Sequence, residues 1–213
     1  MKEKILSQLI KPKMGTRVMM IVVAHIVMGF GVALLKLVGL GTDPYSAMML
    51  ALTNKTSLDY GTFCLIGNCI FFVIEILFGR KYIGIGTIAN WFLLGYLVSF
   101  WSWVFNSVGV VCPSDFVLRV IVCVVAVFIL GFSLSFYQSA DVGSSPYDCL
   151  PLIITDRFHA PFFAARVALD AASLLIAFLA HGVLGLGTVL VMLFLGPIAG
   201  FINTHFSEKF VKE

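Results

Sequence analysis

The chain has 213 residues, of which 60% are hydrophobic and only 12% charged, with a formal net charge of +3. A soluble domain carries about 25% charged residues, so this composition indicates an integral membrane protein and leaves no room for a soluble catalytic domain. The five cysteines are odd in number and form no C-x-x-C pair, which argues against a disulfide framework or a zinc site.

Six apolar runs are long enough to cross a bilayer, because a spanning helix needs about 20 mostly apolar residues. Two shorter helical segments reach only about 15 Å each, half the hydrocarbon thickness, and cannot span. In chain order the eight expected helices are 16–38, 44–54, 61–78, 83–105, 116–139, 146–155, 161–180 and 183–206. The prediction is a single all-α membrane domain over residues 1–213, with six transmembrane helices and two half-helices.

The chain contains an internal repeat. The stretch GLGTDPYSAMML returns as DVGSSPYDCLPL, so that Pro44 aligns with Pro146 (146 − 44 = 102), and GIGT at 84–87 returns as GLGT at 185–188. The repeats cover about 16–106 and 116–206. Three spans per half is an odd number, so two homologous halves must lie in opposite orientations, which predicts an inverted repeat.

The distribution of positive charge favours the same topology, with both termini in the cytoplasm. The outer side receives Lys55, with Lys36 and Arg119 near that boundary. The inner side receives Lys2, Lys4, Lys11, Lys13, Arg17, Arg80, Lys81, Arg157, Lys209 and Lys212.

Each half carries a G-x-x-P-Tyr element at the start of its half-helix. Proline suits the first helical turn, and Thr42 or Asp43 in one copy, and Ser144 or Ser145 in the other, can cap it. Such a terminus is a natural anion site, and paired Gly/Pro-interrupted segments point to the substrate site of inverted-repeat transporters. The alternative is a capped turn without a ligand. The candidate substrate-binding residues are Asp43, Pro44, Tyr45, Ser145, Pro146, Tyr147, Asp148, Asn68 and His25.

Asp170 lies near the middle of an expected span. A carboxylate there costs about 2.5–3.5 kcal/mol on insertion scales and is functional by default. Arg166 precedes it by one turn, so an i, i+4 ion pair is expected, and Asn68 is the repeat counterpart of Asp170. Asp170 and Arg166 are therefore the candidate coupling pair, with a purely structural ion pair as the alternative.

Two other polar side chains lie within the spans. A lone histidine such as His25 more often makes an interhelical hydrogen bond than binds a ligand. Glu75 is close to a span end, where it can reach Arg80 or Lys81, which predicts a second structural ion pair. Helix contacts through small residues are expected at Gly29-x-x-x-Ala33, at Ala164, Ala168 and Ala172, and at Gly196-x-x-x-Gly200.

The doubled GLGTDPYS and DVGSSPYD elements, the two G-x-G-T turns and the chain length resemble the bacterial YczE-like membrane proteins, which are related to the YitT group. The resemblance covers nearly the whole chain. It implies a multi-pass transporter of the bacterial cytoplasmic membrane and carries over no catalytic residues.

The expected function is a secondary transporter or exporter of a small organic solute that works by alternating access. The alternatives are a substrate-binding membrane subunit of a vitamin-uptake complex and a non-transporting regulatory or scaffold protein. Because H-E-x-x-H, G-x-S-x-G and P-loop motifs are missing, the protein is not expected to be an enzyme or to hold a metal or cofactor. The expected partners are the lipid bilayer and a small-molecule substrate but no nucleic acid, and the sequence allows a homodimer.

Overall fold

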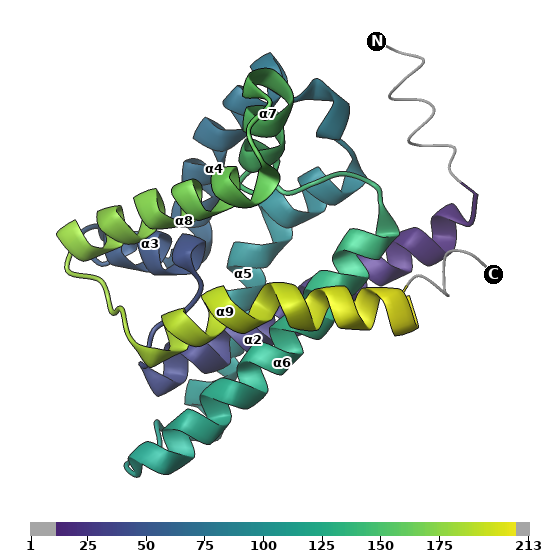
Figure 1. The fold of residues 1–213 in the computed structure, drawn as a ribbon. Coiled ribbons are helices and arrows are strands. Elements are labelled where there is room, and N and C mark those ends of the chain that lie inside the picture. The colour runs from purple at the N-terminus through teal and green to yellow at the C-terminus, as the bar shows by residue number, and fades with distance from the viewer. Residues whose placement is uncertain (1–11, 208–213) are drawn as a thin grey trace.

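The structure is a computed structural model that describes residues 12–207 (Figure 1). Within this range the chain forms α2 (Met14–Val38), α3 (Pro44–Thr53), α4 (Tyr60–Phe78), α5 (Ile85–Val108), α6 (Phe116–Ala140), α7 (Cys149–Phe158), α8 (Phe162–Leu179) and α9 (Leu186–Ile202). The 3-10 turn η1 (Arg80–Tyr82) precedes α5, and the π-helical turn η2 (Asn203–Ser207) follows α9. The all-helical prediction is confirmed for these residues. The expected inner charges at Lys2, Lys4, Lys11, Lys209 and Lys212 lie outside the described range.

Among residues 12–207, five helices are long and apolar enough to cross a membrane, namely α2, α4, α5, α6 and α9 together with η2. The sixth expected span corresponds to α8, an 18-residue helix that carries Arg166 and Asp170. The prediction of six spans is therefore confirmed for five. Large apolar side chains stay exposed along these helices, as with Met19 (67% exposed) and Ile70 (65%), which is typical of a surface that faces lipid rather than water.

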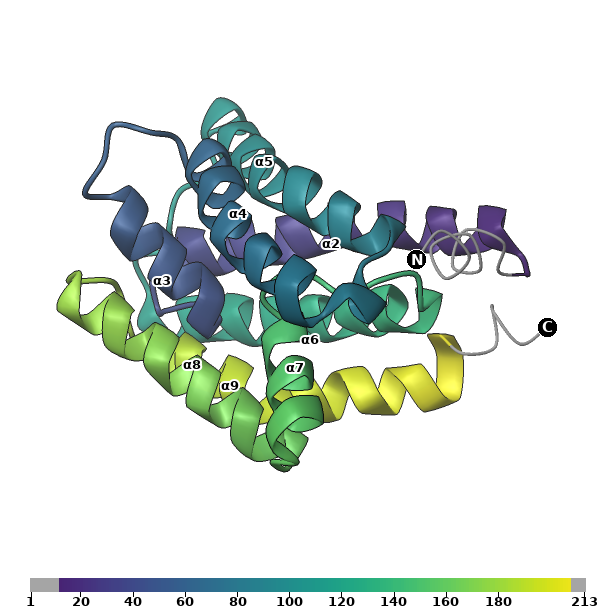
Figure 2. The same cartoon turned by 90° about the horizontal axis from the view of Figure 1, so that it is seen from above.

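The first helices of the two halves, α2 and α6, lie side by side (Figures 1 and 2). Arg17 near the start of α2 donates from Nη1 to the Ala140 carbonyl at the end of α6 over 2.7 Å. Arg119 near the start of α6 donates from Nη2 to the Val38 carbonyl at the end of α2 over 2.6 Å. The two helices are therefore antiparallel, and each arginine satisfies a carbonyl that has no partner within its own helix.

The two G-x-G-T turns dock on the opposite halves. The Gly86 N–H donates to the Val142 carbonyl over 2.8 Å, and the Gly187 N–H donates to the Leu40 carbonyl over 2.7 Å. A Cβ atom on Gly185 would lie only 2.7 Å from that same Leu40 oxygen. The last helix of each half therefore starts on the loop that precedes the half-helix of the other half.

The docked loops also need glycine for their own conformation. Gly41 has a φ of +98° and Gly143 a φ of +118°, a region that glycine adopts without steric cost. A Cβ atom at Gly143 would lie 2.7 Å from the Gly84 nitrogen. The glycines of the G-x-x-P-Tyr element are thus explained by turn geometry and close packing.

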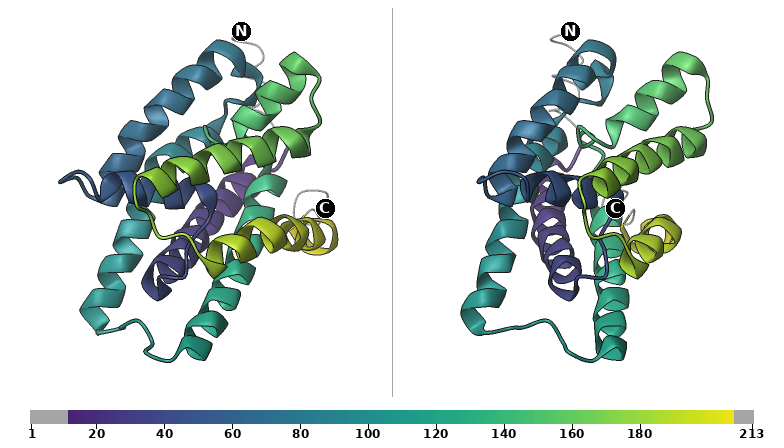
Figure 3. Two further views of the ribbon diagram at one scale, coloured as in Figure 1. Left: turned by 60° about the vertical axis from the view of Figure 1, so that its left-hand side comes forward. Right: turned by 90° about the vertical axis from the view of Figure 1, so that its left-hand side faces the viewer.

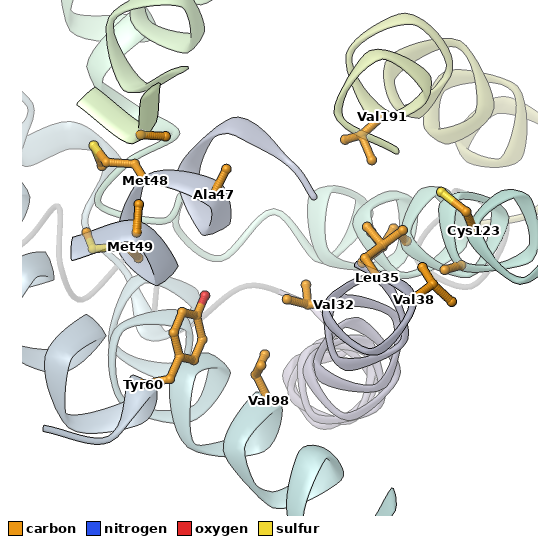
Figure 4. Packing of buried hydrophobic residues seen from close by; sticks show 14 of the residues in the cluster. Val32, Leu35, Val38, Ala47, Met48, Met49, Tyr60, Val98, Cys123 and Val191 are labelled. Carbon is orange, nitrogen blue, oxygen red and sulfur yellow. The ribbon is translucent and has the colours of Figure 1, made fainter. Parts of the chain in front are cut away.

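The hydrophobic core joins both halves around α2 (Figure 4). Leu35 and Val38 of α2 lie near Val191 of α9 and Cys123 of α6, and α3, α4 and α5 add side chains on the other side of α2. The half-helices extend from this core, since α3 packs along α8, and α7 packs against α8 and α4 (Figure 3).

The structure tests three further expectations, on the starts of the half-helices and on two glycine packing motifs. α3 begins at Pro44 as predicted, but regular helix in α7 begins at Cys149 and not at Pro146, because residues 146–148 form a turn. Gly29 is closely packed, since a Cβ atom there would lie 2.7 Å from the Leu97 Cβ. The expected packing motif at Gly196 and Gly200 is wrong within the described chain, where a Cβ atom on either would have nothing within 4 Å.

The docking of the G-x-G-T turn predicts that Gly185→Ala destabilises the protein. The added methyl group collides with the Leu40 carbonyl, and overpacking of this kind costs about 1–3 kcal/mol. Thermal unfolding in detergent measures the loss as a lower melting temperature.

The matched control is Gly196→Ala, which adds the same methyl group inside α9 without a collision. It is expected to be neutral or to stabilise the helix by up to about 1 kcal/mol. Equal melting temperatures for the two variants would contradict the docked turn.

Candidate functional site

The tyrosines of the two repeated elements meet each other. The ring centroids of Tyr45 and Tyr147 are 5.0 Å apart. Phe71 of α4 contacts both rings, at 6.5 Å from Tyr45 and 5.8 Å from Tyr147. Because Tyr45 opens α3 and Tyr147 lies in the turn before α7, equivalent positions of the two halves form one aromatic cluster.

Each tyrosine hydroxyl donates a hydrogen bond to a polar side chain on the helix that comes after the half-helix of its own half. Tyr45 donates to Asn68 Oδ1 over 2.9 Å, and Tyr147 donates to Asp170 Oδ1 over 2.9 Å. The spacing is the same in both halves (68 − 45 = 23 and 170 − 147 = 23). The structure thus brings together four of the predicted site residues in two equivalent pairs.

One arginine holds two carboxylates beside this cluster. Arg166 Nε lies 3.0 Å from Asp170 Oδ2, which confirms the expected i, i+4 ion pair, and Arg166 Nη1 lies 2.5 Å from Asp148 Oδ1. The guanidinium also lies over the Tyr147 ring, 5.4 Å from its centroid. Two carboxylates against one guanidinium leave a formal charge of −1 when all three are ionised.

The charged group extends from the interior to the edge of the protein. The Asp170 side chain is 13% exposed, whereas those of Arg166 and Asp148 are 32% and 34% exposed. Asp170 therefore lies deeper in the protein than the Arg166–Asp148 pair.

The predicted side-chain cap is present at α3, whereas α7 has none and Ser145 instead accepts the Asp148 N–H in the turn before it. In α3, which begins with Pro44, Asp43 Oδ1 accepts the Ser46 N–H over 2.9 Å, so a carboxylate occupies the position that an anion would take. In the second half the turn starts at Pro146, and Ser145 Oγ donates to Asp148 Oδ2 over 2.6 Å. Ser145 therefore orients the carboxylate that binds Arg166.

His25 is not brought to this cluster. It is fully buried in α2, with Nδ1 at 2.7 Å from the Ile21 carbonyl oxygen and its ring edge-on to Tyr137 of α6 at 5.3 Å. Two members of the cluster, Phe71 and Ser173, were not predicted from the sequence. The Ser173 Oγ lies 2.9 Å from the Tyr147 hydroxyl. Phe71 and Ser173 are counterparts in the repeat (173 − 71 = 102). Extending the repeat alignment along the helices that carry Asn68 and Asp170 could therefore have identified both positions.

The shared arginine predicts an order of stability among charge-removing variants. Asp170→Asn leaves Arg166 paired with Asp148 and is expected to lower the melting temperature modestly. Arg166→Gln strands two carboxylates and is expected to cost more. Breaking a buried pair typically costs about 3–5 kcal/mol, and the cost is smaller here because Arg166 and Asp148 are partly exposed.

The double variant Arg166→Gln/Asp170→Asn is the control. It removes the guanidinium and the buried carboxylate together, so thermal unfolding should show recovery of most of the loss caused by Arg166→Gln. A double variant less stable than either single variant would contradict the shared-arginine arrangement.

Comparison with known proteins identifies relatives over most of the chain. Residues 15–204 match a family described as "Family of unknown function (DUF6198)". An uncharacterized protein of Haemophilus influenzae is 26% identical over 82% of this chain and 78% of its own length. From Bacillus subtilis, the uncharacterized membrane protein YczE is 27% identical over 83% of this chain and 80% of its own length, and the uncharacterized protein YyaS is 25% identical over 86% and 92%.

No solved structure matches the chain. The resemblance to YczE that the repeated motifs indicated is confirmed, and YczE, like this chain with its five apolar helices, is a membrane protein. The chain is a multi-pass membrane protein that belongs to the DUF6198 family.

Proposed function

We propose that the protein is a secondary transporter that moves a small organic cation across the bacterial cytoplasmic membrane by alternating access. The observation that carries the proposal is the contact between Tyr45 and Tyr147, at 5.0 Å between ring centroids. In inverted-repeat transporters the substrate site lies where the repeats meet and is typically formed by interrupted helices. Here Tyr45 of the short helix α3 and Tyr147 in the turn before the short helix α7 meet between the two halves.

The proposed topology is an inverted repeat with both termini in the cytoplasm. Counting α8 as the sixth span gives three spans in each half, and the antiparallel α2 and α6 support opposite orientations of the halves. The reciprocal docking of the G-x-G-T turns would then allow one half to rock against the other around the tyrosine cluster.

The charge of the cluster favours a cationic substrate. Arg166 is already bound by Asp148 and Asp170, so an anion would have to displace a carboxylate from it. An amine or quaternary ammonium group would instead pair with the carboxylate in excess and take the place of the Arg166 guanidinium over the Tyr147 ring. Attraction of this kind is worth about 0.5–2 kcal/mol for each cation–aromatic contact.

The proposed role of the Arg166–Asp170 pair is coupling. Arg166 connects α8 to the turn before α7 through Asp148. A cation that binds Asp148 or Asp170 competes with Arg166, and this competition would loosen the link between α8 and α7. Substrate binding would in this way favour a change in packing of the second half.

The topology predicts a pattern of chemical labelling. Single cysteines at Lys55 and Arg157, in a cysteine-free background, should differ in their reaction with a membrane-impermeant thiol reagent added to intact cells. Position 55 should react and position 157 should not, because the reagent reaches only the outer side. Both positions are exposed to solvent in the structure, so burial does not explain a difference. Labelling of 157 alone would contradict the topology.

The substrate class is tested with purified protein and a panel of amines, quaternary ammonium compounds and organic anions. A cation is expected to raise the melting temperature, as any ligand of the native state does, and to accumulate in liposomes that contain the protein. Asp148→Asn removes the carboxylate in excess and should weaken cation binding about 10- to 100-fold, the value of a charge-assisted hydrogen bond.

The matched control is Asp59→Asn, which neutralises the carboxylate that caps α4 through the Thr62 N–H far from the charged pair along the chain. It should leave cation binding unchanged. Stabilisation by anions alone would contradict the cationic substrate. Cation binding without flux would favour a substrate-binding subunit, and neither binding nor flux would favour a regulatory or scaffold protein.

A further inference from the structure

Glu75 lies near the end of α4 and is fully buried, with 0% of its surface exposed. The expected ion pair with Arg80 or Lys81 is wrong: Arg80 Nε donates to the Ile76 carbonyl over 2.6 Å, and Lys81 pairs with Asp156 of α7. Within the described chain, neither carboxyl oxygen of Glu75 has a hydrogen-bond partner. A buried acid without a counter-ion needs another explanation.

Titratable groups of α7 and α6 lie near Glu75. The Cys149 thiol of α7 is the polar group beside the carboxyl, and Asp148 precedes it. Tyr137 of α6 lies within electrostatic range, and its ring contacts His25 of α2. The Tyr137 hydroxyl and His25 Nε2 also lack a hydrogen-bond partner among the described residues. The neighbouring helix α5 contains no charged residue.

The charged groups at the surface near this end of α4 have other partners. Asp156, which pairs with Lys81, also accepts a hydrogen bond from the Tyr82 hydroxyl over 2.6 Å. The hydrogen bond from Lys81, and after it the one from Tyr82, lowers the pKa of Asp156. The Arg157 guanidinium lies over the Phe78 ring at 4.9 Å. No ion pair to Glu75 is present within residues 12–207.

A carboxylate in such surroundings is unfavourable. Burial of an isolated charge costs so much free energy that the group binds a proton and becomes neutral. The cover over Glu75 is α7: a Cβ atom on Gly79, one turn beyond Glu75, would lie 3.1 Å from Cys149 Sγ and 2.7 Å from Ile153 Cδ1. The burial of Glu75 therefore depends on α7 packing against the last turn of α4.

We propose that Glu75 is a proton-binding site that is controlled by α7. The carboxyl group holds a proton while α7 covers it and releases that proton to water when α7 moves away from α4. The O–H bond of the acid is broken and the proton passes to water, with no change in oxidation state. The site belongs to one half only, because the repeat counterpart of Glu75 is Ala177 (177 − 75 = 102).

The link between this proton site and transport rests on the proposed function. α7 begins directly after Tyr147 and Asp148, so the same half-helix responds to the solute at Arg166 and to the proton at Glu75. Glu75 would then be the group that links a proton gradient to solute movement, while the Arg166–Asp170 pair responds to the solute.

Infrared spectroscopy of the purified full-length protein tests the proton site without any transport. At neutral pH the protein should show the carbonyl stretching band of a protonated carboxylic acid, with the small shift in deuterium oxide that marks such an acid. Glu75→Gln and Glu75→Ala should each abolish this band, and the control Asp59→Asn should retain it. A band that persists in both Glu75 variants, or no band in the wild type, overturns the proposal.

Stability against pH gives a second readout. A carboxyl that is protonated in the folded state and ionises in the unfolded chain destabilises the protein as the pH rises above about 4.3. The wild type should therefore lose several degrees of melting temperature between about pH 5 and about pH 8, and Glu75→Ala, which mirrors Ala177, should lose less. Identical pH profiles for wild type and variant would overturn the proposal.

The proposed link between the proton at Glu75 and solute transport is tested separately in liposomes. Glu75→Gln should abolish accumulation driven by a pH gradient while solute binding survives. If the wild type moves no solute, the proposed function fails, but the infrared band still decides whether Glu75 binds a proton. If gradient-driven accumulation persists in Glu75→Gln, Glu75 does not link the proton gradient to solute transport.

Discussion

The reciprocal hold between α2 and α6 is the constraint on which the remaining structure depends. In lipid, helices gain no hydrophobic free energy by associating, and backbone polar groups must find partners inside the protein. Arg17 and Arg119 meet both needs, because each binds the free carbonyl at the end of the opposite helix. This arrangement fixes two long helices antiparallel and in register, and the loops that leave their ends are placed as a result.

Those loops bring the two half-helices to a common point. Each loop receives a hydrogen bond from the G-x-G-T turn of the other half, so each half contributes to the conformation of the other half's loop. The repeated glycines thus have a structural role, and the tyrosines that follow them are left to form the cluster between the halves. The structure therefore explains the glycines of the repeated element by packing, and it places the tyrosines in contact between the halves.

The two buried acids among residues 12–207, Glu75 and Asp170, differ in the partners of their carboxyl groups. Asp170 pairs with Arg166 and accepts a hydrogen bond from the Tyr147 hydroxyl, which also contacts Ser173. Glu75 has no such partners within the described chain, and its surroundings favour the neutral form. α7 connects the two environments, since Asp148 at its start binds Arg166 and Cys149 covers Glu75.

The sequence by itself determined the positions of the helices, the repeat and the pairing of Arg166 with Asp170. Periodic apolar runs and the offset between Pro44 and Pro146 are local signals, and the i, i+4 spacing fixed the pairing of Arg166 with Asp170. Only the tertiary structure decided which residues meet across the halves, because contacts between distant segments leave no trace in spacing. It moved the start of α7 past Pro146 and gave Arg166 a second partner. It left Glu75 buried instead of paired with Arg80, because the packing of α7 on α4 determines which side chains can reach the surface.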